Sequence, residues 1–501
     1  MNTVSSGLET WRNTHPDALL ALGMFAFLRA VGLANLVKAL WIFAFCLPLV
    51  GCGGGSGGGS SEPVQPPPPP PANTAWWQAS ANNRYLVDES GVPTLLVGDS
   101  PHSMFVNLSA ADLSTYLANR QWRGFNVLWV QGLCSDYIAN CRRDLSTYDG
   151  IRPFTSGTDE TNYDVSTPNE AYWSRVDSYI DIAAAYGLSV LFDTWETAAL
   201  MPLARANGNS KMRAFGAFLG NRYKNFPNII WITGNDFQTW TDATDNSLMQ
   251  NLMAGIASAD SNHLQTTQLN YNESGSLDDA LLAPYTRLAG AYSYYCSYTQ
   301  TMSQYNHASN VPVFFEEGFY EYNGTTFGTI RNLRKQAWWA GLNGATAGQL
   351  YGSENVYPFE RGWQNYLDTT GVVEFGHLNS LLKSIRWYDL VPDQGHVVVT
   401  SGYGTFDPGN NYTCIDTNDY VTTSYLADGT ASLSYTPQAA TLTVDMSKFR
   451  GTVTAKWFDP IAGTAVDVPG SPFANSGNRA FPTRGSNSAG DSDWVLVLTA
   501  Q

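Results

Sequence analysis

Short apolar runs with the composition of strands alternate with helix-like segments through the middle of this 501-residue chain. Runs without a polar face are typical of parallel strands in a sheet that is covered on both sides. About eight such runs occur, at residues 95–100, 125–131, 188–195, 229–236, 264–271, 289–295, 312–318 and 346–352. The pattern predicts an α/β fold, a (β/α)8 TIM barrel with enlarged loops over residues 76–390.

The main alternative is an open, doubly wound sheet. Such a sheet would carry a glycine-rich phosphate-binding turn after its first strand. The sequence at that place is GDSPHS (98–103), which fits neither GxGxxG nor GxxxxGK[ST]. A nucleotide-binding role is therefore disfavoured, and the barrel remains the preferred fold.

The pattern changes after about residue 390. The strand-like stretches become short and lie between turns, with no helical spacing: HVVVTSGY, YTCIDTN, YVTTSYLAD, ATLTVDMSKF, GTVTAKWFDP and DWVLVLTA. Short strands of this kind predict a small antiparallel β-sandwich over residues 391–501. This domain could bind glycan or only pack against the barrel, and packing is slightly favoured.

The N-terminal region has the features of a secretory signal. An apolar run at 39–51 is preceded by Arg29 and Lys38 and followed directly by Cys52, and LVGC resembles a bacterial lipobox. We expect residues 1–52 to be a lipoprotein-type signal peptide, starting at Met1 or Met24, with Cys52 lipidated. An uncleaved anchor is the alternative, although the run is short for a span of about 20 residues.

Residues 53–75 are rich in Gly and Ser and then in Pro, which is typical of a tether that is first flexible and then stiff. Together with the lipid anchor, this linker predicts a location in the bacterial cell envelope, on the outer membrane or cell surface, facing the periplasm or the exterior. In an oxidising envelope, Cys134 and Cys141 could form a local disulfide. The spacing of Cys296 and Cys414 suggests no pairing.

Composition excludes some classes of ligand. The net charge of −16 argues against nucleic acid, which needs a basic surface. The chain has 16 Trp and 27 Tyr among few charges, which suits stacking on sugar rings but equally suits a large aromatic core. No HExxH and no suitably placed GxSxG occurs, so we expect neither a metal nor a cofactor.

Two carboxylates follow opposed strands of the predicted barrel. Barrel active sites lie at the C-terminal ends of the strands. Asp236 ends the fourth run, IIWITGND, and Glu317 ends the seventh. A pair of carboxylates that flanks a glycosidic bond is the minimum equipment for its hydrolysis. We therefore predict Asp236 and Glu317 as catalytic, with Glu316 as an open competitor because alternation lets only one of the two glutamates point inward.

Other strand-end residues are amides, aromatics and acids, with almost no base among them. This set suits a neutral, polyhydroxylated ligand, so we expect a polysaccharide or oligosaccharide substrate. The predicted substrate-binding residues are Asp99, His102, Gln131, Trp195, Asn235, Tyr292, Tyr320 and Tyr351.

Several segments resemble a known family, the apiosidase-like glycoside hydrolases. The matching segments are RYLVDESGVPTLLVGDS, NRQWRGFNVLWVQ, IIWITGND and PVFFEEGFYE. The later segments AKWFDPIAGTAV and DSDWVLVL resemble a β-domain often joined to that family and labelled collagen-binding. The label rests on association and does not itself indicate affinity for collagen.

The resemblance implies a clan-A (β/α)8 barrel that removes apiose-linked units from a complex pectin. It also implies that Asp236 is the general acid/base and Glu317 the nucleophile. Two features depart from the expected pattern. The clan normally has Asn-Glu where this chain has Asn235-Asp236, and Gly318 stands where a proline is expected. These departures leave open the stereochemistry and the choice between Glu316 and Glu317.

Two other functions use the same features. A surface glycan-binding lipoprotein that has lost catalysis would keep the aromatic residues and the tether. A structural or adhesive envelope protein would depend on the C-terminal domain instead.

Overall fold

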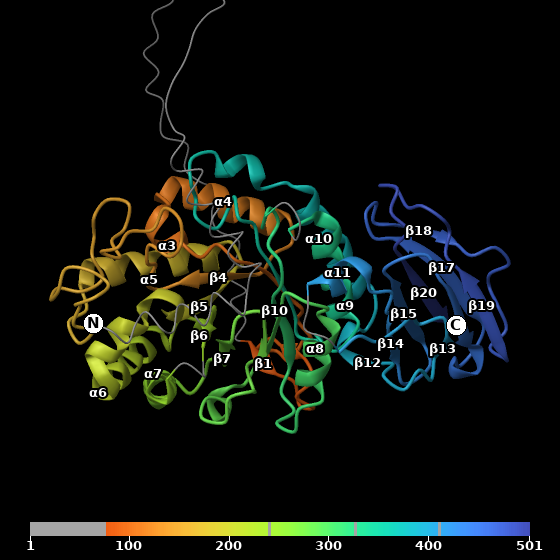
Figure 1. Ribbon diagram of the computed structural model, residues 1–501, viewed down its shortest axis with the longest axis horizontal. Helices are drawn as coiled ribbons and strands as arrows, with labels where there is room; N and C mark the ends of the chain where they lie inside the picture. Colours follow the sequence, from red (N-terminus) through yellow and green to blue (C-terminus); the bar gives the residue numbers. More distant parts are fainter. Residues whose placement is uncertain (1–76, 239–241, 325–327, 409–411) are drawn as a thin grey trace, which may run out of the picture. The chain divides into compact units, whose positions relative to one another are not determined.

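The computed structural model of the protein describes residues 77–238, 242–324, 328–408 and 412–501 (Figure 1). The predicted signal peptide, the lipidation site Cys52 and the tether all lie outside the described residues. Within the described ranges, no helix has both the length and the apolar character that a membrane span requires.

The central feature is a nearly closed sheet of nine strands, of which eight are parallel. Its strands are β3 (Leu96–Asp99), β4 (Val127–Gln131), β5 (Ser189–Glu196), β6 (Ile229–Phe237), β7 (Gln265–Leu269), β8 (Glu273–Gly275), β9 (Ala289–Ser293), β10 (Val313–Glu317) and β11 (Gly348–Tyr351). Their order is β7-β6-β5-β4-β3-β11-β10-β9-β8, and only β8 is antiparallel to its neighbour. The predicted (β/α)8 barrel is confirmed, and each predicted run overlaps one parallel strand.

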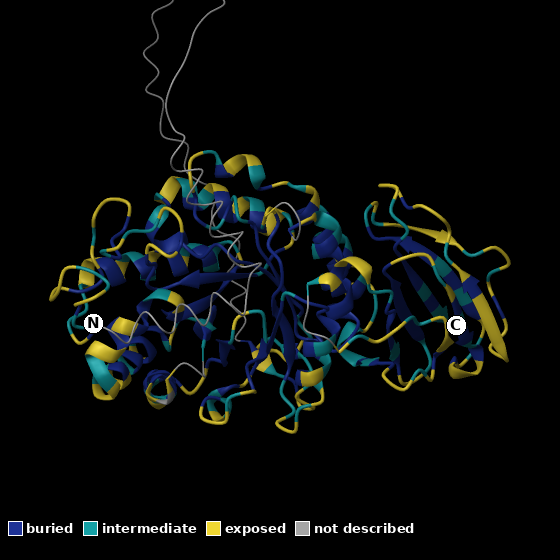
Figure 2. Cartoon of the chain, in the orientation of Figure 1, coloured by how far each residue is buried: buried dark blue, intermediate teal, exposed yellow. Residues whose placement is uncertain are grey.

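Helices follow most of the parallel strands and surround the sheet (Figure 1). They are α3 (Met104–Asn107), α4 (Ala110–Trp122), α5 (Glu170–Ala185), α6 (Thr197–Tyr223), α7 (Ala243–Ala259), α8 (Tyr298–Tyr305), α9 (Ile330–Gly341) and α10 (Thr370–Lys383). The strands are buried on both faces, as their apolar sequences predict (Figure 2).

Two hydrogen bonds bridge the place where the sheet is not continuous, between β7 and the β8–β9 pair. The backbone N–H of Arg287 donates to the carbonyl oxygen of Gln265 at 2.8 Å. The hydroxyls of Thr266 and Ser276 lie 3.0 Å apart. At its N-terminal end the barrel is covered by the β1 (Gln78–Ala79) and β2 (Leu86–Val87) hairpin, and the buried Trp77, just before β1, donates to Ser189.

Alternation along the strands separates an inner core from an outer one. The inner core gathers apolar side chains from most of the strands, among them Leu96, Trp129, Leu191, Ile232, Phe314 and Leu350. Residues of the opposite parity pack outward, against the helices. Three register shifts break this rule: between Asp193 and Glu196 on β5, between Thr233 and Phe237 on β6, and between Phe315 and Glu317 on β10.

The chain after residue 389 forms two antiparallel sheets, which we call the β-domain (residues 390–501). Its strands are β12 (Leu390–Pro392), β13 (Val399–Ser401), β14 (Thr422–Leu426), β15 (Ala431–Thr436), β16 (Thr441–Asp445), β17 (Val453–Asp459), β18 (Thr464–Asp467), β19 (Asn478–Pro482) and β20 (Trp494–Ala500). One sheet has the order β12-β14-β15-β20-β17-β18 and the other β13-β16-β19. The expectation of an antiparallel β-domain is confirmed.

The prediction of one strand in the β-domain is wrong. The segment YTCIDTN contains the short helix α11 (Thr413–Thr417) instead of a strand. The loop that carries α11 leaves the sheets and is bonded to the barrel, where Trp339 Nε1 donates to the carbonyl oxygen of Tyr420 at 2.9 Å. Docking against the barrel therefore decides the conformation of this segment.

The β-domain packs on helix α9 through a buried ionic cluster and stacked aromatic rings. The guanidinium of Arg334 donates to Asp493 at 2.8 Å, to Asp491 at 2.6 Å and to Glu374 at 2.8 Å. Next to it, the rings of Trp338 and Tyr435 stack with their centroids 5.8 Å apart. These contacts join residues of the barrel and of the β-domain in one core.

Candidate active site

Strand β6 ends in a turn that places Asp236 at the C-terminal mouth of the barrel. Gly234, Asn235 and Asp236 have φ values of 134°, 72° and 60°. Only glycine fits the first position, where a Cβ would lie 2.1 Å from the carbonyl oxygen of Gln268. Left-handed residues other than glycine cost about 1–3 kcal/mol each and concentrate at functional sites. The predicted substrate-binding residue Asn235 lies in this turn, beside the acid.

The carboxyl group of Asp236 is held by a tyrosine from β9. The hydroxyl of Tyr292 donates to Asp236 Oδ1 at 2.7 Å. Burial raises the pKa of Asp236 to about 6, although the Tyr292 hydrogen bond lowers it. Asp236 can therefore carry a proton close to neutral pH, as a general acid must.

Glu317 lies at the end of β10 and accepts two hydrogen bonds. Tyr294 donates to its Oε1 at 2.6 Å, and the amide of Gln268 donates to its Oε2 at 2.8 Å. Burial, and then the negative charge of Asp236, raise the pKa of Glu317 to about 8, while the two donors lower it. Because the charge of Asp236 raises the pKa of Glu317, the two carboxyls are not readily ionised together.

Gln268 connects the two acids. Its Oε1 accepts from the backbone N–H of Asp236 at 3.0 Å, and its amide donates to Glu317. A single side chain on β7 therefore fixes the position of both members of the pair.

The expectation that only one of Glu316 and Glu317 faces the barrel interior is wrong. Glu316 lies on the same side of β10 as Phe314, which faces the barrel interior. A Cβ added to the inward-facing Gly290 would lie 2.2 Å from the Glu316 carboxylate, so this side chain fills the space that the glycine leaves. The register shift between Phe315 and Glu317 then returns Glu317 to the same side, where it meets Tyr294. The bulge therefore gives the site two adjacent glutamates at different depths.

Glu316 belongs to a buried polar layer next to Asp236 and Glu317. It is 1% exposed, and burial together with the charges of Glu317 and Asp193 raises its pKa well above the usual range. Both oxygens of Glu316, one oxygen of Asp193 and both amide atoms of Gln131 have no hydrogen-bond partner among the described protein atoms.

His102 and Tyr320 form another part of the wall. His102 Nε2 and the Tyr320 hydroxyl lie 2.8 Å apart, and the imidazole meets the inner-core Trp129 edge to face at 4.8 Å. Burial lowers the pKa of His102 to about 3, so its ring is neutral and can exchange hydrogen bonds with a sugar hydroxyl.

Two predicted substrate-binding residues, Asp99 and Tyr351, point away from the barrel interior. Asp99 Oδ2 accepts from Arg120 Nε and from the Tyr116 hydroxyl, both at 2.5 Å, and both partners are on α4. The hydroxyl of Tyr351 donates to Glu321, and its ring packs in the outer core. Their neighbours Gly98 and Leu350 occupy the inward positions, so alternation along β3 and β11 explains both corrections.

Trp195 is a third correction, with a different cause. The indole is fully buried in the outer core and meets Phe215 at 6.0 Å, so it cannot stack on a sugar. Simple alternation from Leu191 would turn Trp195 inward. The register shift after Asp193 turns it outward and turns Glu196 toward the site, where Ser135 donates to Glu196 at 2.9 Å.

Sequence reasoning assigned no role to several residues of the site. Tyr294 and Gln268 hold Glu317, and burial raises the pKa of Glu196 to about 7. Tyr292 and Tyr294 are two positions apart, so their side chains lie on the same side of the strand. This spacing could have indicated that each acid is held by its own tyrosine.

Among the described residues, no group of three or more His, Cys, Asp or Glu side chains could hold a metal ion.

Two disulfides lie near the mouth. Cys134 and Cys141 are bonded, which confirms the predicted pair in the loop after β4. The second joins Cys296 to Cys414, a pair that the sequence did not suggest.

Comparisons with known proteins agree with this geometry. The family described as "Apiosidase-like, catalytic domain" matches residues 80–389, and the one described as "Putative collagen-binding domain of a collagenase" matches residues 391–499. No curated protein matches the chain.

Two solved structures share the fold. One, named as a glycoside hydrolase, is 21% identical with a TM-score of 0.71, covering 86% of this chain and 98% of its own. A glycoside hydrolase family 5 protein from Bacteroides vulgatus ATCC 8482 is also 21% identical with a TM-score of 0.71, covering 86% of this chain and 94% of its own. Since the first family match spans more than half of the sequence, the chain belongs to the apiosidase-like glycoside hydrolases.

Proposed function

We propose that this protein hydrolyses a glycosidic bond in a side chain of a plant or other complex polysaccharide, with Asp236 as general acid/base and Glu317 as nucleophile. The observation that carries this proposal is the pair of buried carboxyl groups joined through Gln268. Asp236 and Glu317 come from β6 and β10, are joined through Gln268, and each accepts a hydrogen bond from its own tyrosine.

The proposed reaction has two steps. In the first, Glu317 forms a bond to the anomeric carbon, the glycosidic C–O bond breaks, and the proton of Asp236 passes to the leaving oxygen. In the second, ionised Asp236 takes a proton from water, whose oxygen bonds to the anomeric carbon and releases Glu317. The donors Tyr294 and Gln268 support the assignment of Glu317 as nucleophile because they stabilise its ionised form, against burial and the charge of Asp236, which raise the pKa of Glu317 above that of Asp236.

The charge around the pair favours a neutral sugar over a uronic acid. Burial raises the pKa of Tyr137, and the charges of Asp236, Glu196, Glu317 and Glu354 raise it further, so four acids lie around this phenol at the mouth. An anionic sugar would be repelled there. Together with family membership, this supports removal of a neutral, apiose-type unit from a pectic side chain.

We also propose that the enzyme acts at the bacterial cell envelope, anchored by lipidated Cys52 through the 53–75 tether. The two disulfides support an oxidising compartment. We further propose that the barrel domain spans residues 76–390 and the C-terminal β-domain residues 391–501. Labelling intact cells with radioactive palmitate tests the anchor, since wild-type protein should carry the label and Cys52→Ser should not.

A glycan screen tests the hydrolase. Purified protein is incubated with pectic, hemicellulosic and host glycans, and released sugars are separated by chromatography. Asp236→Asn is run in parallel, with Asp428→Asn as a control because Asp428 is an exposed acid of the β-domain. Release that Asp428→Asn retains and Asp236→Asn loses supports the proposal. Equal release by Asp236→Asn contradicts it, and saturable binding without release by the wild type would favour a glycan-binding role.

A further inference from the structure

An exposed tyrosine, Tyr271, contacts the ring of Tyr294, which donates a hydrogen bond to Glu317 of the catalytic pair. Tyr271, on the turn after β7, is 47% exposed. Its ring meets that of Tyr294 edge to face with centroids 5.6 Å apart, and Tyr294 holds Glu317. Burial of its hydroxyl raises the pKa of Tyr271, and the charge of Asp236 raises it further. Tyr271 therefore presents an aromatic surface beside the acids.

The turn that carries Tyr271 is held by a residue of the β-domain. The hydroxyl of Tyr412 donates to the side-chain oxygen of Asn272 at 2.5 Å, and Asn272 has a left-handed φ of 79°. The ring of Tyr412 packs against Tyr295 at 5.1 Å and Phe319 at 6.2 Å. Phe319 in turn stacks on Tyr294 at 5.0 Å with an interplanar angle of 2°. Tyr412 thus packs behind the aromatic wall of the site.

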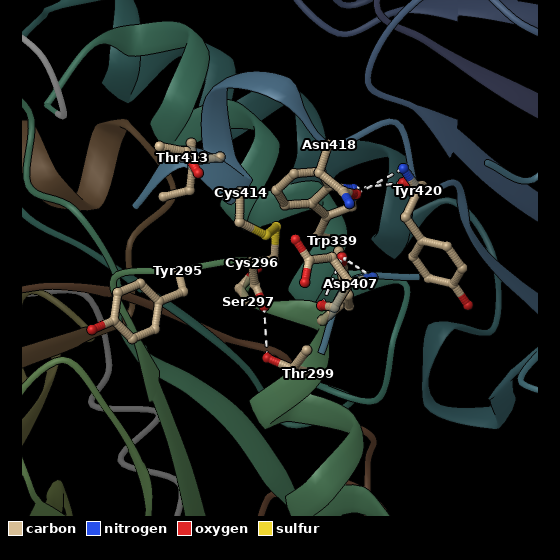
Figure 3. The surroundings of a disulfide bond; sticks show 12 residues. Tyr295, Cys296, Ser297, Thr299, Trp339, Asp407, Thr413, Cys414, Asn418 and Tyr420 are labelled. Atoms are coloured by element: carbon tan, nitrogen blue, oxygen red, sulfur yellow. Dashed lines mark hydrogen bonds between the residues drawn. A yellow bond between two sulfur atoms is a disulfide. The ribbon is translucent and has the colours of Figure 1, made fainter. Parts of the chain in front are cut away.

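A disulfide fixes the segment that carries Tyr412. Cys414 lies on α11, two residues after Tyr412, and bonds to Cys296 in the segment between β9 and α8 (Figure 3). The bond joins residues 118 positions apart in the sequence. Beyond the disulfide, the ammonium of Lys335 on α9 donates to the carbonyl oxygen of Ile415. The barrel and the β-domain are therefore covalently joined next to the active site.

We propose that the β-domain completes a sugar-stacking subsite of the barrel, in which Tyr271 binds a second sugar unit of the substrate and Tyr412, fixed by the Cys296–Cys414 disulfide, positions Tyr271. This inference rests on the proposed function, because it takes the second sugar to be attached at the bond that Asp236 and Glu317 cleave. Stacking of a sugar ring on a tyrosine face needs an exposed ring with a fixed orientation, and these contacts supply both. Tyr412 and the two cysteines are positioning residues.

The test compares a short and a long substrate with the full chain. The probes are methyl apioside and an apiose-bearing pectic oligosaccharide. Tyr271→Ala should raise KM for the oligosaccharide about three- to tenfold with little change in kcat, and leave methyl apioside unaffected. Tyr271→Trp, which keeps an aromatic face, should restore KM. Tyr412→Phe and the double variant Cys296→Ser/Cys414→Ser should raise the same KM. Trp122→Ala is the matched control, since Trp122 is 71% exposed at the end of α4, near the start of β4 and away from the mouth.

Binding separates this inference from the proposed function. Calorimetry of wild-type protein and the same variants with the pectic oligosaccharide does not require catalysis. If the wild type hydrolyses nothing but binds the oligosaccharide in a Tyr271-dependent way, the hydrolase proposal fails and the subsite stands. If the wild type hydrolyses the oligosaccharide while Tyr271→Ala and Tyr412→Phe leave KM and affinity unchanged, the subsite is overturned. The absence of any binding by the wild type overturns it as well.

Discussion

The hydroxyl of Tyr294 donates a hydrogen bond of 2.6 Å to Oε1 of Glu317. This bond lowers the pKa of Glu317, against the effects of burial and of the charge on Asp236. The tyrosine therefore favours the ionised glutamate that a nucleophile requires.

Tyr294→Phe tests this relationship. Removal of the donor should raise the pKa of Glu317 further and lower kcat about tenfold, because hydrogen bonds to charged groups contribute about 1.5–3 kcal/mol. The limb of the pH–activity curve near pH 8 should move to higher pH, since Glu317, whose pKa is raised to about 8 in the wild type, then loses its proton later. Tyr148→Phe, on an exposed loop, is the control. An unchanged limb near pH 8 in Tyr294→Phe would contradict the assignment.

The wild-type pH profile should be bell-shaped. The pair is active with one proton, and burial raises the pKa of Asp236 to about 6 and that of Glu317 to about 8. As the pH rises, activity should increase when the first of the two protons leaves and fall when the second leaves, with limbs near pH 6 and pH 8. The limbs belong to the pair, so they are expected whichever carboxyl holds the shared proton. A profile of kcat/KM that is flat from pH 5 to 9 would exclude such a pair.

The ionic cluster of Arg334 should contribute strongly to stability. Its guanidinium is almost fully buried among Asp493, Asp491 and Glu374. Arg334→Ala would leave the buried carboxylates of Asp493 and Glu374 without this counter-charge and should cost about 3–5 kcal/mol. Thermal unfolding measures this, with the exposed Arg386→Ala as a control that should leave Tm nearly unchanged. A similar small change for both variants would show that the cluster contributes little.

Trp195 and Tyr320 should behave differently when substituted. Trp195 is buried in the outer core, so Trp195→Phe should lower Tm without changing KM. Tyr320 bonds His102 in the wall of the site, so Tyr320→Phe should raise KM several-fold with a smaller effect on Tm. Kinetics and thermal unfolding of the two variants measure both effects. A higher KM in Trp195→Phe would reinstate it as a sugar contact.

The sequence predicts the barrel well because burial of a parallel sheet on both faces leaves a direct trace in apolar runs such as IIWIT. It also places Asp236 and Glu317 at the correct ends of their strands. That a residue stands at the end of a strand does not decide on which face of the sheet its side chain lies, however. Alternation from Leu96 and Leu350 would have turned Asp99 and Tyr351 outward.

Trp195 and Glu316 were less accessible to sequence reasoning. Their surroundings depend on register shifts in β5 and β10, and a bulge is set by neighbouring strands as much as by its own residues. The Cys296–Cys414 bond depends on how α11 docks against the barrel, which no local pattern encodes.

The central claim is that Glu317 performs the chemistry while the adjacent Glu316 does not. The most direct test is kcat for Glu317→Gln and Glu316→Gln on the glycan from which the wild type releases sugar. We predict a fall on the order of 10³-fold or more for Glu317→Gln, as for other essential nucleophiles, and a clearly smaller one for Glu316→Gln. Wild-type turnover by Glu317→Gln, or a larger loss for Glu316→Gln, would contradict the account.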